Sequence, residues 1–255
     1  MFRLGKIYFR SMSSLETITH FNVYDNLYKK HYGKYLQAYR PTKDHDLELY
    51  INQLIKPQID ETILDCGSGF GAVAEQVSHQ SKKVYAINIC KNQIPLNESK
   101  VTYIHSDFDR MDFIFKNEQV FDKIIFMESL GYSKNTDILL RKCKNLLKTK
   151  GKLILKEFFS KNLFNKKLKD LQLRSISLTK KIYNYQILDN NNIQNILNSL
   201  DLKTLSIQHP HFECDWSNSF HFEQSIINNQ NLKVMHKESQ KDNLFDCLEI
   251  IAEKS

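Results

Sequence analysis

Glycine, proline and tryptophan are scarce in this sequence. Its 255 residues include 7 glycines, 4 prolines and 1 tryptophan. This scarcity excludes collagen-like chains and Pro- or Gly-rich disordered chains. No apolar run approaches the ~18 residues of a membrane-spanning helix, so we expect no transmembrane segment. With 41% hydrophobic and 25% charged residues, the composition is that of an ordinary globular protein.

The cysteines are few, odd in number and far apart. They are Cys66, Cys90, Cys143, Cys214 and Cys247, and no two of them form a Cys-x-x-Cys pair. This spacing argues against a disulfide framework and against the common zinc motifs. We therefore expect a reducing compartment and a cytoplasmic location.

The chain is basic, with a formal net charge of +7 and a pI near 9.0. Arg3, Lys6 and Arg10 give it a basic start without the apolar core of a secretory signal, which leaves an organellar presequence as an alternative. Residues 161–181 hold seven Lys or Arg and one Asp. Such a segment forms a solvated helical face, or a surface for a phosphate-bearing substrate, a lipid headgroup or nucleic acid. Its near-absence of aromatic residues argues against stacking on nucleic-acid bases.

Apolar patterns that alternate between strand and helix follow a helical beginning. Apolar residues at helical spacing over 47–55 predict a helix that stops before Pro57. Later helices are expected over 70–79, over 139–147 with an end at Gly151, and over 193–200. We expect strands at 62–65, 84–89, 101–105, 121–126, 153–158, 202–207 and 247–252.

This order predicts an α/β fold: a doubly wound, mostly parallel seven-stranded sheet with helices on both faces. We expect one structural domain overall. Residues 1–58 would form a helical segment over the ligand site, and residues 59–255 the core, with a basic insertion at about 160–200. Ligands of such sheets bind at the carboxyl ends of the strands.

Three of the seven glycines lie within five positions, after the apolar run Ile63–Leu64 and Asp65. Their spacing predicts a strand, a tight turn that lets a ligand approach the backbone, and the start of a helix. Gly67, Gly69 and Ala72 fit the dinucleotide fingerprint G-x-G-x-x-G/A. However, Asn88 stands at the end of the second strand, where a dinucleotide site places an acid.

The same turn resembles the glycine motif of class I S-adenosylmethionine-dependent methyltransferases, which includes the acid Asp65 and all three glycines. The resemblance covers roughly residues 60–160 in order, so it is more specific than one glycine turn. It continues through Val84-Tyr85-Ala86-Ile87-Asn88-Ile89, Asp107-Phe108, Phe121-Asp122-Lys123-Ile124-Ile125-Phe126 and Leu146-Leu147-Lys148-Thr149-Lys150-Gly151-Lys152-Leu153.

The resemblance implies a set of cofactor-binding residues. Asp65 would fix the turn or the cofactor's amino group, Asp107 would accept from the adenine amine, and Phe108 would lie near the ring. Asn88 replaces the family's usual acid for the ribose hydroxyls, although an amide can donate and accept there too. The implied cofactor-binding residues are Tyr24, Asp65, Gly67, Gly69, Gly71, Asn88, Ile89, Gln93, Asp107 and Phe108.

Three segments are similar to a subgroup: cyclopropane-fatty-acid-synthase-like, sterol-type and prenyl-diphosphate methyltransferases. These segments are Asn88–Gln93, Met127–Tyr132 with its Glu-Ser pair, and Val23–Tyr28 with its Tyr-Asp pair. In these relatives the amino-terminal segment folds over the cofactor, and the Glu-Ser pair lies beside the transferred methyl.

Glu128 and Tyr132 are the expected catalytic residues. Methyl transfer is an in-line displacement, which needs alignment and a dry, electrostatically matched site. An aromatic face, that of Tyr24, Tyr28 or Tyr132, would stabilise the sulfonium. Glu128 would stabilise a carbocation and act as a base with an alkene acceptor, or orient an amine acceptor. On this assignment, Glu128→Gln lowers turnover more than cofactor affinity.

A second polar cluster runs from His209 to Asp215, with His221 nearby. Its imidazoles, thiol and carboxylates are suitable metal ligands, but the spacing matches no standard site, so we predict no metal. The segment would pack as a loop or line the acceptor pocket. His105, before Asp107, has no partner that would support a catalytic role.

The sequence therefore predicts an S-adenosylmethionine-dependent methyltransferase that acts on carbon or nitrogen of a small-molecule or lipid-like acceptor. The basic segment would suit an anionic acceptor, and a nucleic-acid partner is disfavoured. Two alternatives are an NAD(P)-dependent oxidoreductase and a non-catalytic S-adenosylmethionine-binding partner protein.

Overall fold

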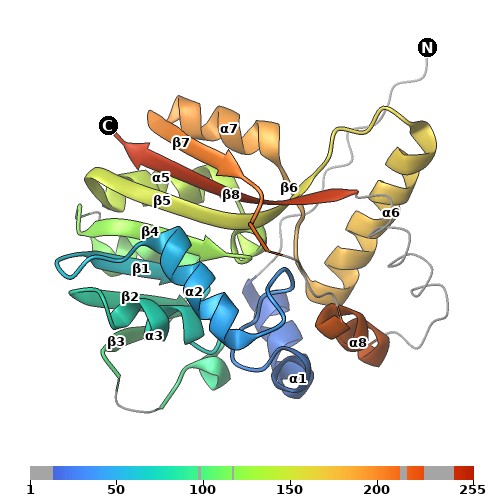
Figure 1. Ribbon diagram of the computed structural model, residues 1–255, viewed down its shortest axis with the longest axis horizontal. Helices are drawn as coiled ribbons and strands as arrows, with labels where there is room; N and C mark the ends of the chain where they lie inside the picture. Colours follow the sequence, from blue (N-terminus) through green and yellow to red (C-terminus); the bar gives the residue numbers. More distant parts are fainter. Residues whose placement is uncertain (1–13, 97–98, 117, 213–216, 227–243) are drawn as a thin grey trace.

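One mixed sheet forms the centre of the computed structural model (Figure 1). The structure describes residues 14–96, 99–116, 118–212, 217–226 and 244–255. Within them the strand order is β3-β2-β1-β4-β5-β8-β7, and β6 pairs with β5 outside this path. The strands are β1 (Thr62–Cys66), β2 (Lys83–Asn88), β3 (Val101–His105), β4 (Phe121–Met127), β5 (Leu147–Ser160), β6 (Leu188–Asp189), β7 (Leu202–Gln208) and β8 (Phe245–Lys254).

The sheet is parallel except at β8, which runs antiparallel to both β5 and β7. The pairs of β1 with β2 and β4, and of β2 with β3, are parallel. Strand order reverses beside β1, so the carboxyl ends of β1 and β4 flank the crevice where doubly wound sheets bind ligands. The predicted doubly wound, mostly parallel sheet is confirmed.

Helices cover both faces of the sheet. On one face, α2 (Asp44–Ile55) and α3 (Ala72–Ser78) bury their apolar stripes; Leu47, Ile51 and Leu54 recur at helical spacing and pack on β1 and β4. On the other face lie α4 (Met111–Phe115), α5 (Thr136–Leu146) and α7 (Asn190–Ser199). Short 3₁₀ turns follow three strands: η1 (Lys91–Gln93), η2 (Phe108–Arg110) and η3 (Leu130–Tyr132).

Three further helices gather beyond the carboxyl ends of the strands (Figure 1). They are α1 (Ser14–Tyr32), α6 (Lys166–Tyr183) and α8 (Ser217–Ile226). Tyr28 and Tyr32 of α1, Ile182 of α6 and Phe222 of α8 form a small core of their own. Across the described residues, every helix is too short or too polar to span a membrane.

Two details differ from the sequence prediction. The helix expected to end at Gly151 ends at Leu146 instead, because Leu147 already pairs with Phe121 in the sheet. Residues 148–151 form an irregularity inside β5, with Lys150 at φ +64°, so Gly151 closes a bulge and not a helix. The second difference is the two-residue strand β6, which no pattern indicated because so short a strand has no periodicity.

Candidate active site

The glycine turn joins β1 to α3. Gly67, Gly69 and Gly71 have φ values of +78°, +54° and +82°, a region that L-residues with a Cβ rarely adopt. The N–H groups of Gly67 and Ser68 donate to the carbonyl of Ile87 at 2.9 and 3.0 Å, which ties the turn to β2. A Cβ at Gly67 would lie 2.6 Å from that of Ser129. The turn therefore needs glycine both for its dihedral angles and for its close contact with the loop after β4.

A cavity of about 100 Å³ lies against this turn; we call it the glycine-turn cavity. Most of the sequence-predicted site residues meet there, although they come from four strand ends. Its predicted lining residues are Asp65, Gly67, Gly69, Asn88, Ile89, Gln93, Asp107, Phe108, Glu128 and Tyr132.

Two predicted residues lie outside the lining of this cavity. Tyr24 packs against His20 on α1, with ring centroids 5.0 Å apart, in the small core shared with α6 and α8. Gly71 faces the ring of Tyr103, with which a Cβ would collide. Gly71 thus serves the turn and the packing of β3, and the structure gives Tyr24 no place at the cavity.

Buried polar atoms at the glycine-turn cavity lack hydrogen-bond partners among the described residues. They are Asp65 Oδ2, Ser68 Oγ, Gln93 Nε2 and Gln37 Nε2. An unpaired buried polar atom costs about 1–3 kcal/mol. The set offers acceptors and donors together, so it suits a ligand with an ammonium group and several hydroxyl or carbonyl groups.

Asp65 is 2% exposed at the carboxyl end of β1. Burial raises the pKa of its carboxyl to about 7, although a hydrogen bond from the backbone N–H of Ala74 acts to lower it. A cation at Oδ2 would restore the ionised form.

Asn88 supports the glycine turn. Its Nδ2 donates to the carbonyl of Gly69 at 2.9 Å and to Oε1 of Gln93 at 3.1 Å. A carboxylate could make neither bond, since it only accepts. The amide in place of the family's acid therefore has a structural reason in this chain.

We expect Asn88→Asp to weaken S-adenosylhomocysteine binding by about tenfold, because two donors are lost and a carboxylate faces a carbonyl. Isothermal titration calorimetry of the full chain measures the change. Tighter binding by the variant would show instead that position 88 contacts the ligand directly and that its contacts to the turn are secondary.

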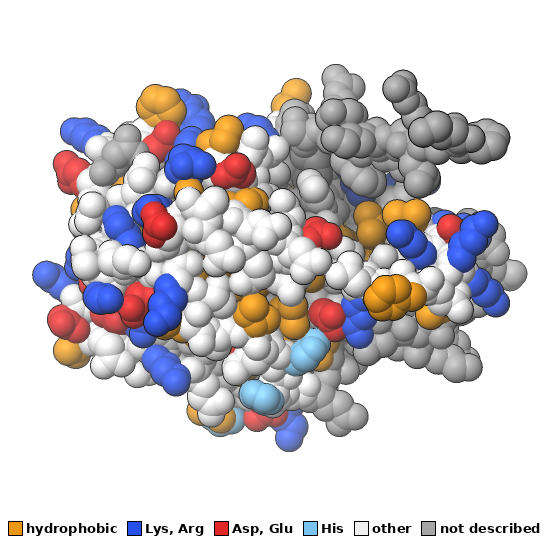
Figure 2. Space-filling model, turned by 90° about the horizontal axis from the view of Figure 1, so that it is seen from above, with side chains coloured by type: hydrophobic (Ala, Val, Ile, Leu, Met, Phe, Trp, Pro, Cys, Tyr) orange, Lys and Arg blue, Asp and Glu red, His pale blue; other side chains and the backbone are white. Residues whose placement is uncertain are grey.

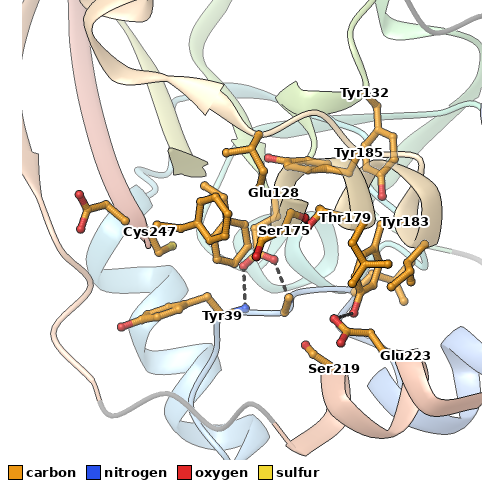
Figure 3. Close-up of a pocket in the computed structure, with 18 of the residues that line it drawn as sticks. Tyr39, Glu128, Tyr132, Ser175, Thr179, Tyr183, Tyr185, Ser219, Glu223 and Cys247 are labelled. Carbon is orange, nitrogen blue, oxygen red and sulfur yellow. Dashed lines mark hydrogen bonds between the residues drawn. The ribbon is translucent and has the colours of Figure 1, made fainter. Parts of the chain in front are cut away.

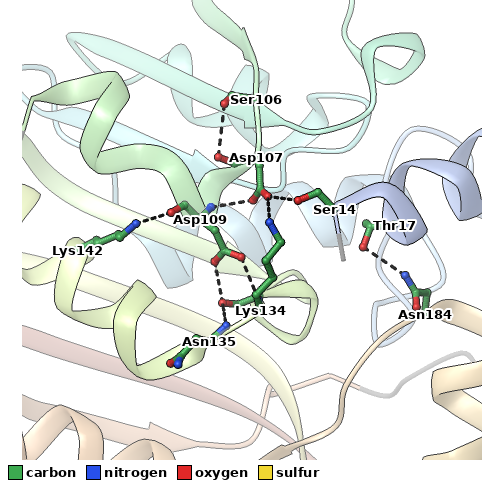
Figure 4. Close-up of polar contacts among 10 residues, drawn as sticks. Ser14, Thr17, Ser106, Asp107, Asp109, Lys134, Asn135, Lys142 and Asn184 are labelled. Atoms are coloured by element: carbon green, nitrogen blue, oxygen red, sulfur yellow. Dashed lines mark hydrogen bonds and ion pairs between the residues drawn. The ribbon is translucent and has the colours of Figure 1, made fainter. Parts of the chain in front are cut away.

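Asp107 lines the cavity and takes part in a polar network (Figure 4). It accepts from Ser14 Oγ at 2.6 Å, Lys134 Nζ at 2.8 Å and the N–H of Asp109 at 2.9 Å. Burial alone would raise the pKa of Asp107, but the hydrogen bonds from Lys134 and Ser14 outweigh it and lower the pKa. Asp107 thus stays ionised and connects α1 to the loop after β4.

A second cavity, of about 470 Å³, adjoins the first. Figure 3 shows residues that line this second cavity. We call it the tyrosine cavity, because six tyrosines line it. Tyr28, Leu36, Glu128 and Tyr132 line both cavities and so separate them. The remaining tyrosines of its lining are Tyr32, Tyr39, Tyr183 and Tyr185.

Glu128 fixes residues 34–39, which we call the strap, between the two cavities. Its Oε2 accepts from the N–H of Ala38 at 2.6 Å, and its Oε1 accepts from the N–H of Tyr39 at 3.1 Å and pairs with Lys156 (Figure 3). Lys156 also donates to Gln37 Oε1 at 2.8 Å and to the carbonyl of Tyr39. Both carboxylate oxygens are therefore engaged in holding the strap.

Tyr132 reaches the boundary from η3, where Glu157 holds the preceding turn. Glu157 Oε1 accepts from the N–H groups of Ser129 and Leu130 at 2.9 and 2.8 Å, and Oε2 accepts from the hydroxyl of Tyr185. Tyr185 packs edge-on against Tyr132 with centroids 5.1 Å apart. Burial raises the pKa of Tyr132 well above its usual range, so its hydroxyl stays protonated.

Sequence reasoning missed Lys156 and Glu157. Both are fully buried in β5, where they hold the strap and the turn before Tyr132. A signal was present: two adjacent charges interrupt an apolar strand, and buried charges are rare unless paired. The partners of these residues lie on distant segments, which the sequence alone does not bring together.

The histidine-rich segment shows no metal site among the described residues. His209 Nδ1 lies 3.2 Å from the carbonyl of Cys247, and its ring lines the edge of the tyrosine cavity. Glu213, Cys214 and Asp215 lie outside the described residues. His105 contacts the carbonyl of Ile89 at 3.1 Å and lies outside the lining of both cavities.

Most of the basic segment lies in α6, whose lysines are absent from the lining of the tyrosine cavity, whereas Lys161, which precedes the helix, is part of that lining. The helix contributes Ser175, Leu178, Thr179, Ile182 and Tyr183 to the lining. On the face seen in Figure 2, Lys and Arg side chains are mixed with Asp and Glu. The role of the basic segment stays an open prediction.

The strand order, the glycine turn after β1 and the cavity beside it define a Rossmann-like methyltransferase fold. Residues 64–155 match the family model described as a methyltransferase domain. This part of the chain is a methyltransferase domain, as the glycine motif predicted. The family model and the similar proteins described below give no support for the oxidoreductase alternative.

Curated relatives match over the same part of the chain. "N-methyltransferase 4" of Papaver somniferum is 29% identical over 96 residues, which are 34% of this chain and 27% of that protein. "Ribosomal RNA small subunit methyltransferase A" of Bacillus licheniformis is 28% identical over 102 residues, 36% of this chain and 35% of that protein. The matched part thus spans about a quarter to a third of these relatives.

Solved structures share the fold over most of this chain. The [4+2]-cyclase SpnF superposes with a TM-score of 0.73 at 13% identity and covers 96% of this chain and 97% of its own. Phosphoethanolamine N-methyltransferase 2 of Haemonchus contortus, with S-adenosyl-L-methionine, superposes with a TM-score of 0.70 at 16% identity. The match covers 95% of this chain and 60% of that protein. Geranyl diphosphate C-methyltransferase of Streptomyces coelicolor A3(2), with S-adenosyl-L-homocysteine, superposes with a TM-score of 0.64 at 12% identity. The match covers 83% of this chain and 80% of that protein.

Proposed function

We propose that this chain is an S-adenosylmethionine-dependent methyltransferase. In this proposal the glycine-turn cavity binds the methyl donor, and the tyrosine cavity binds a small-molecule acceptor. The observation that carries the proposal is that the two cavities adjoin across Tyr28, Leu36, Glu128 and Tyr132. Donor and acceptor would meet at that boundary, as an in-line displacement requires.

The residues at the glycine-turn cavity fit the donor. Asp65 Oδ2 would accept from its amino group, while Gln93 Nε2 and Ser68 Oγ offer partners for other polar groups. Phe108 provides an aromatic face beside Asp107. When bound, the donor supplies an activated methyl group on a sulfonium; the protein supplies orientation and exclusion of water.

The glycine-turn cavity is too small for a whole nucleoside ligand in this structure. Its volume is about 100 Å³, whereas ligand pockets usually measure about 300–1,000 Å³. Leu36 of the strap and Ser14 of α1 line the cavity, and Lys134 crosses to Asp107. Binding therefore requires the strap, α1 or the Lys134 side chain to move outwards. Glu128 controls the strap, which makes it a positioning residue in our account.

The pKa of Asp65 predicts a pH dependence for the donor site. The carboxyl is mostly neutral below about pH 7 and ionised above it. We expect the affinity for S-adenosylhomocysteine to rise about tenfold per pH unit up to about pH 7 and to level off above it, because its ammonium needs the ionised carboxylate. Calorimetry between pH 5.5 and 8.5 measures this rise.

Asp65→Asn is the matched control, since an amide of the same shape does not titrate in this range. We expect the variant to bind weakly with little change over the same pH range. An affinity that is flat with pH in the unchanged chain would remove Asp65 from the amino-group site and leave it as a residue of the turn.

Activity is tested with methyl-labelled S-adenosylmethionine and a cell extract, followed by mass spectrometry of the labelled products. We expect a labelled small molecule. Binding of the donor without any labelled product would favour the alternative of a non-catalytic cofactor-binding partner. This control matters because one structural neighbour with the same fold is a [4+2]-cyclase.

A further inference from the structure

The two faces of α6 differ in character. One face lines the tyrosine cavity with Ser175, Leu178 and Thr179. The other face is turned to solvent at the edge of the molecule, beyond the carboxyl ends of the strands (Figure 1). Of the 18 residues of the helix, six are Lys or Arg and one is Asp, which gives it a net charge of +5. A large part of the positive charge of the chain is therefore concentrated on this helix.

The cations at the start and middle of α6 are uncompensated. Lys166, Lys167, Lys169 and Arg174 are exposed, and among the described residues none of their side chains has an ion-pair or hydrogen-bond partner. Spacings of three and seven residues place Lys169 beside Lys166, and Arg174 beside Lys167, on one side of the helix. Lys161 differs from them, because it precedes the helix and lies 3.1 Å from a carboxylate oxygen of Asp246.

The first turn of α6 is electrostatically unfavourable by itself. The amino end of a helix carries a partial positive charge and favours acids, yet the first turn of α6 has none and begins with Lys166 and Lys167. The side chain of Asn165 accepts from the N–H groups of Lys167 and Leu168 at 2.9 and 3.3 Å, but it adds no negative charge. An anionic partner at this end would offset the charge of the lysines and of the helix end together.

Two apolar side chains lie among these cations. Phe164, beside the cap residue Asn165, is fully exposed. Leu173 is 46% exposed, and it lies seven residues after Lys166 and four after Lys169, so it shares their side of the helix. Water offers such side chains no favourable contact, whereas the boundary between the headgroups and acyl chains of a bilayer does. Stable attachment to a bilayer takes two signals, such as an apolar group and a polybasic patch.

We propose that this side of α6 docks the protein on an anionic lipid bilayer. The docking surface consists of Phe164, Lys166, Lys167, Lys169, Leu173 and Arg174. Anionic headgroups would contact the cations, while the ring of Phe164 enters the interface. A nucleic acid offers the same phosphates, but single strands are held by rings that stack on successive bases, and this surface has one ring. The proposal goes beyond methyl transfer and does not depend on it.

The test is flotation of the full chain with lipid vesicles. One set of vesicles contains phosphatidylcholine alone, and the other contains about 30% phosphatidylserine, both in about 0.1 M salt. We expect the chain to bind the anionic vesicles about tenfold or more tightly than the neutral ones, and to bind them less as salt is added. Equal binding to both sets, or binding to neither, overturns the proposal.

Two variants locate the docking surface. The triple variant Lys166→Gln, Lys167→Gln and Lys169→Gln should weaken binding to the anionic vesicles by about 10- to 100-fold. Phe164→Ser should weaken it by about three- to tenfold, because the ring no longer enters the interface. The substituted side chains are exposed, so thermal unfolding should be unchanged. Vesicle binding that is unaltered in both variants overturns the assignment to α6.

A second triple variant removes the same charge at the opposite edge of the sheet. Lys82, Lys100 and Lys203 are exposed at or just before the amino ends of β2, β3 and β7. Their replacement by Gln should leave vesicle binding unchanged, whereas a loss equal to that of the α6 variant would assign binding to net charge and overturn the docking surface. Binding of single-stranded RNA without any preference for anionic vesicles overturns the proposal in favour of a nucleic acid. The donor site is tested separately, and its proposal stands or falls independently of these results.

Discussion

Gly69→Val is expected to reduce the affinity for S-adenosylhomocysteine by about 10- to 100-fold. Gly69 has φ +54°, and a Cβ there would lie 3.0 Å from Leu36 Cδ1. The branched side chain would fill the space between the turn and the strap, where the donor is proposed to bind. Calorimetry measures the loss of affinity, and urea denaturation measures the loss of stability.

Gly33→Val is a closely matched control. Gly33 also has positive φ, +64°, but a Cβ there meets no atom within 4 Å. Both variants carry the cost of a left-handed backbone, about 1–2 kcal/mol, whereas only the variant at position 69 obstructs the cavity. A folded Gly69→Val variant that binds like the Gly33→Val control would remove the assignment of the glycine turn to the donor.

Glu128→Gln is expected to destabilise the protein by about 3–5 kcal/mol, because it leaves the ammonium of Lys156 buried without its counter-charge. The strap would loosen at Ala38 and Tyr39, and turnover would fall. Since the strap lines both cavities, the affinity for S-adenosylhomocysteine should fall too. Urea denaturation, steady-state kinetics and calorimetry provide the three readouts.

Lys156→Met and the double variant separate a positioning role of Glu128 from a catalytic one. Lys156 is fully buried and holds the same strap, so Lys156→Met should lower turnover and donor affinity in a similar way. The double variant should lose less stability than the sum of the losses in the two single variants, by about 0.5–3 kcal/mol. If Glu128→Gln abolishes turnover with unchanged donor affinity while Lys156→Met stays active, Glu128 is the catalytic group that the sequence predicted.

The sheet was predictable because its strands are short apolar runs between turn residues. Phe121–Met127 is one example: it is almost wholly buried, and its apolar run predicts a strand at the centre of a sheet. The helix end predicted at Gly151 was wrong, because glycine is common both after helices and in β-bulges. Only the pairing of Leu147 with Phe121 in the sheet shows that Gly151 belongs to a bulge. The predicted Rossmann-like methyltransferase fold is confirmed.

The donor site was more predictable than the acceptor site for a physical reason. Asp65 and Asn88 lie at the carboxyl ends of β1 and β2, and Asp107 comes two residues after β3, so sheet topology alone brings them to one edge. The tyrosine cavity is assembled from α1, α6, α8 and the strap, whose mutual packing depends on contacts between segments more than 100 residues apart, such as Tyr32 with Tyr183 and Ser219. No local pattern records those contacts.

The central claim is that the glycine turn binds S-adenosylmethionine. Calorimetric titration of the full chain with S-adenosylmethionine, S-adenosylhomocysteine, NAD and NADP tests it most directly. We predict one binding site for each of the first two ligands, with an affinity that falls about 10- to 100-fold in Gly69→Val and is kept in Gly33→Val, and no binding of the nicotinamide cofactors. Tight binding of NAD or NADP, with none of the methyl donor or its product, would contradict it.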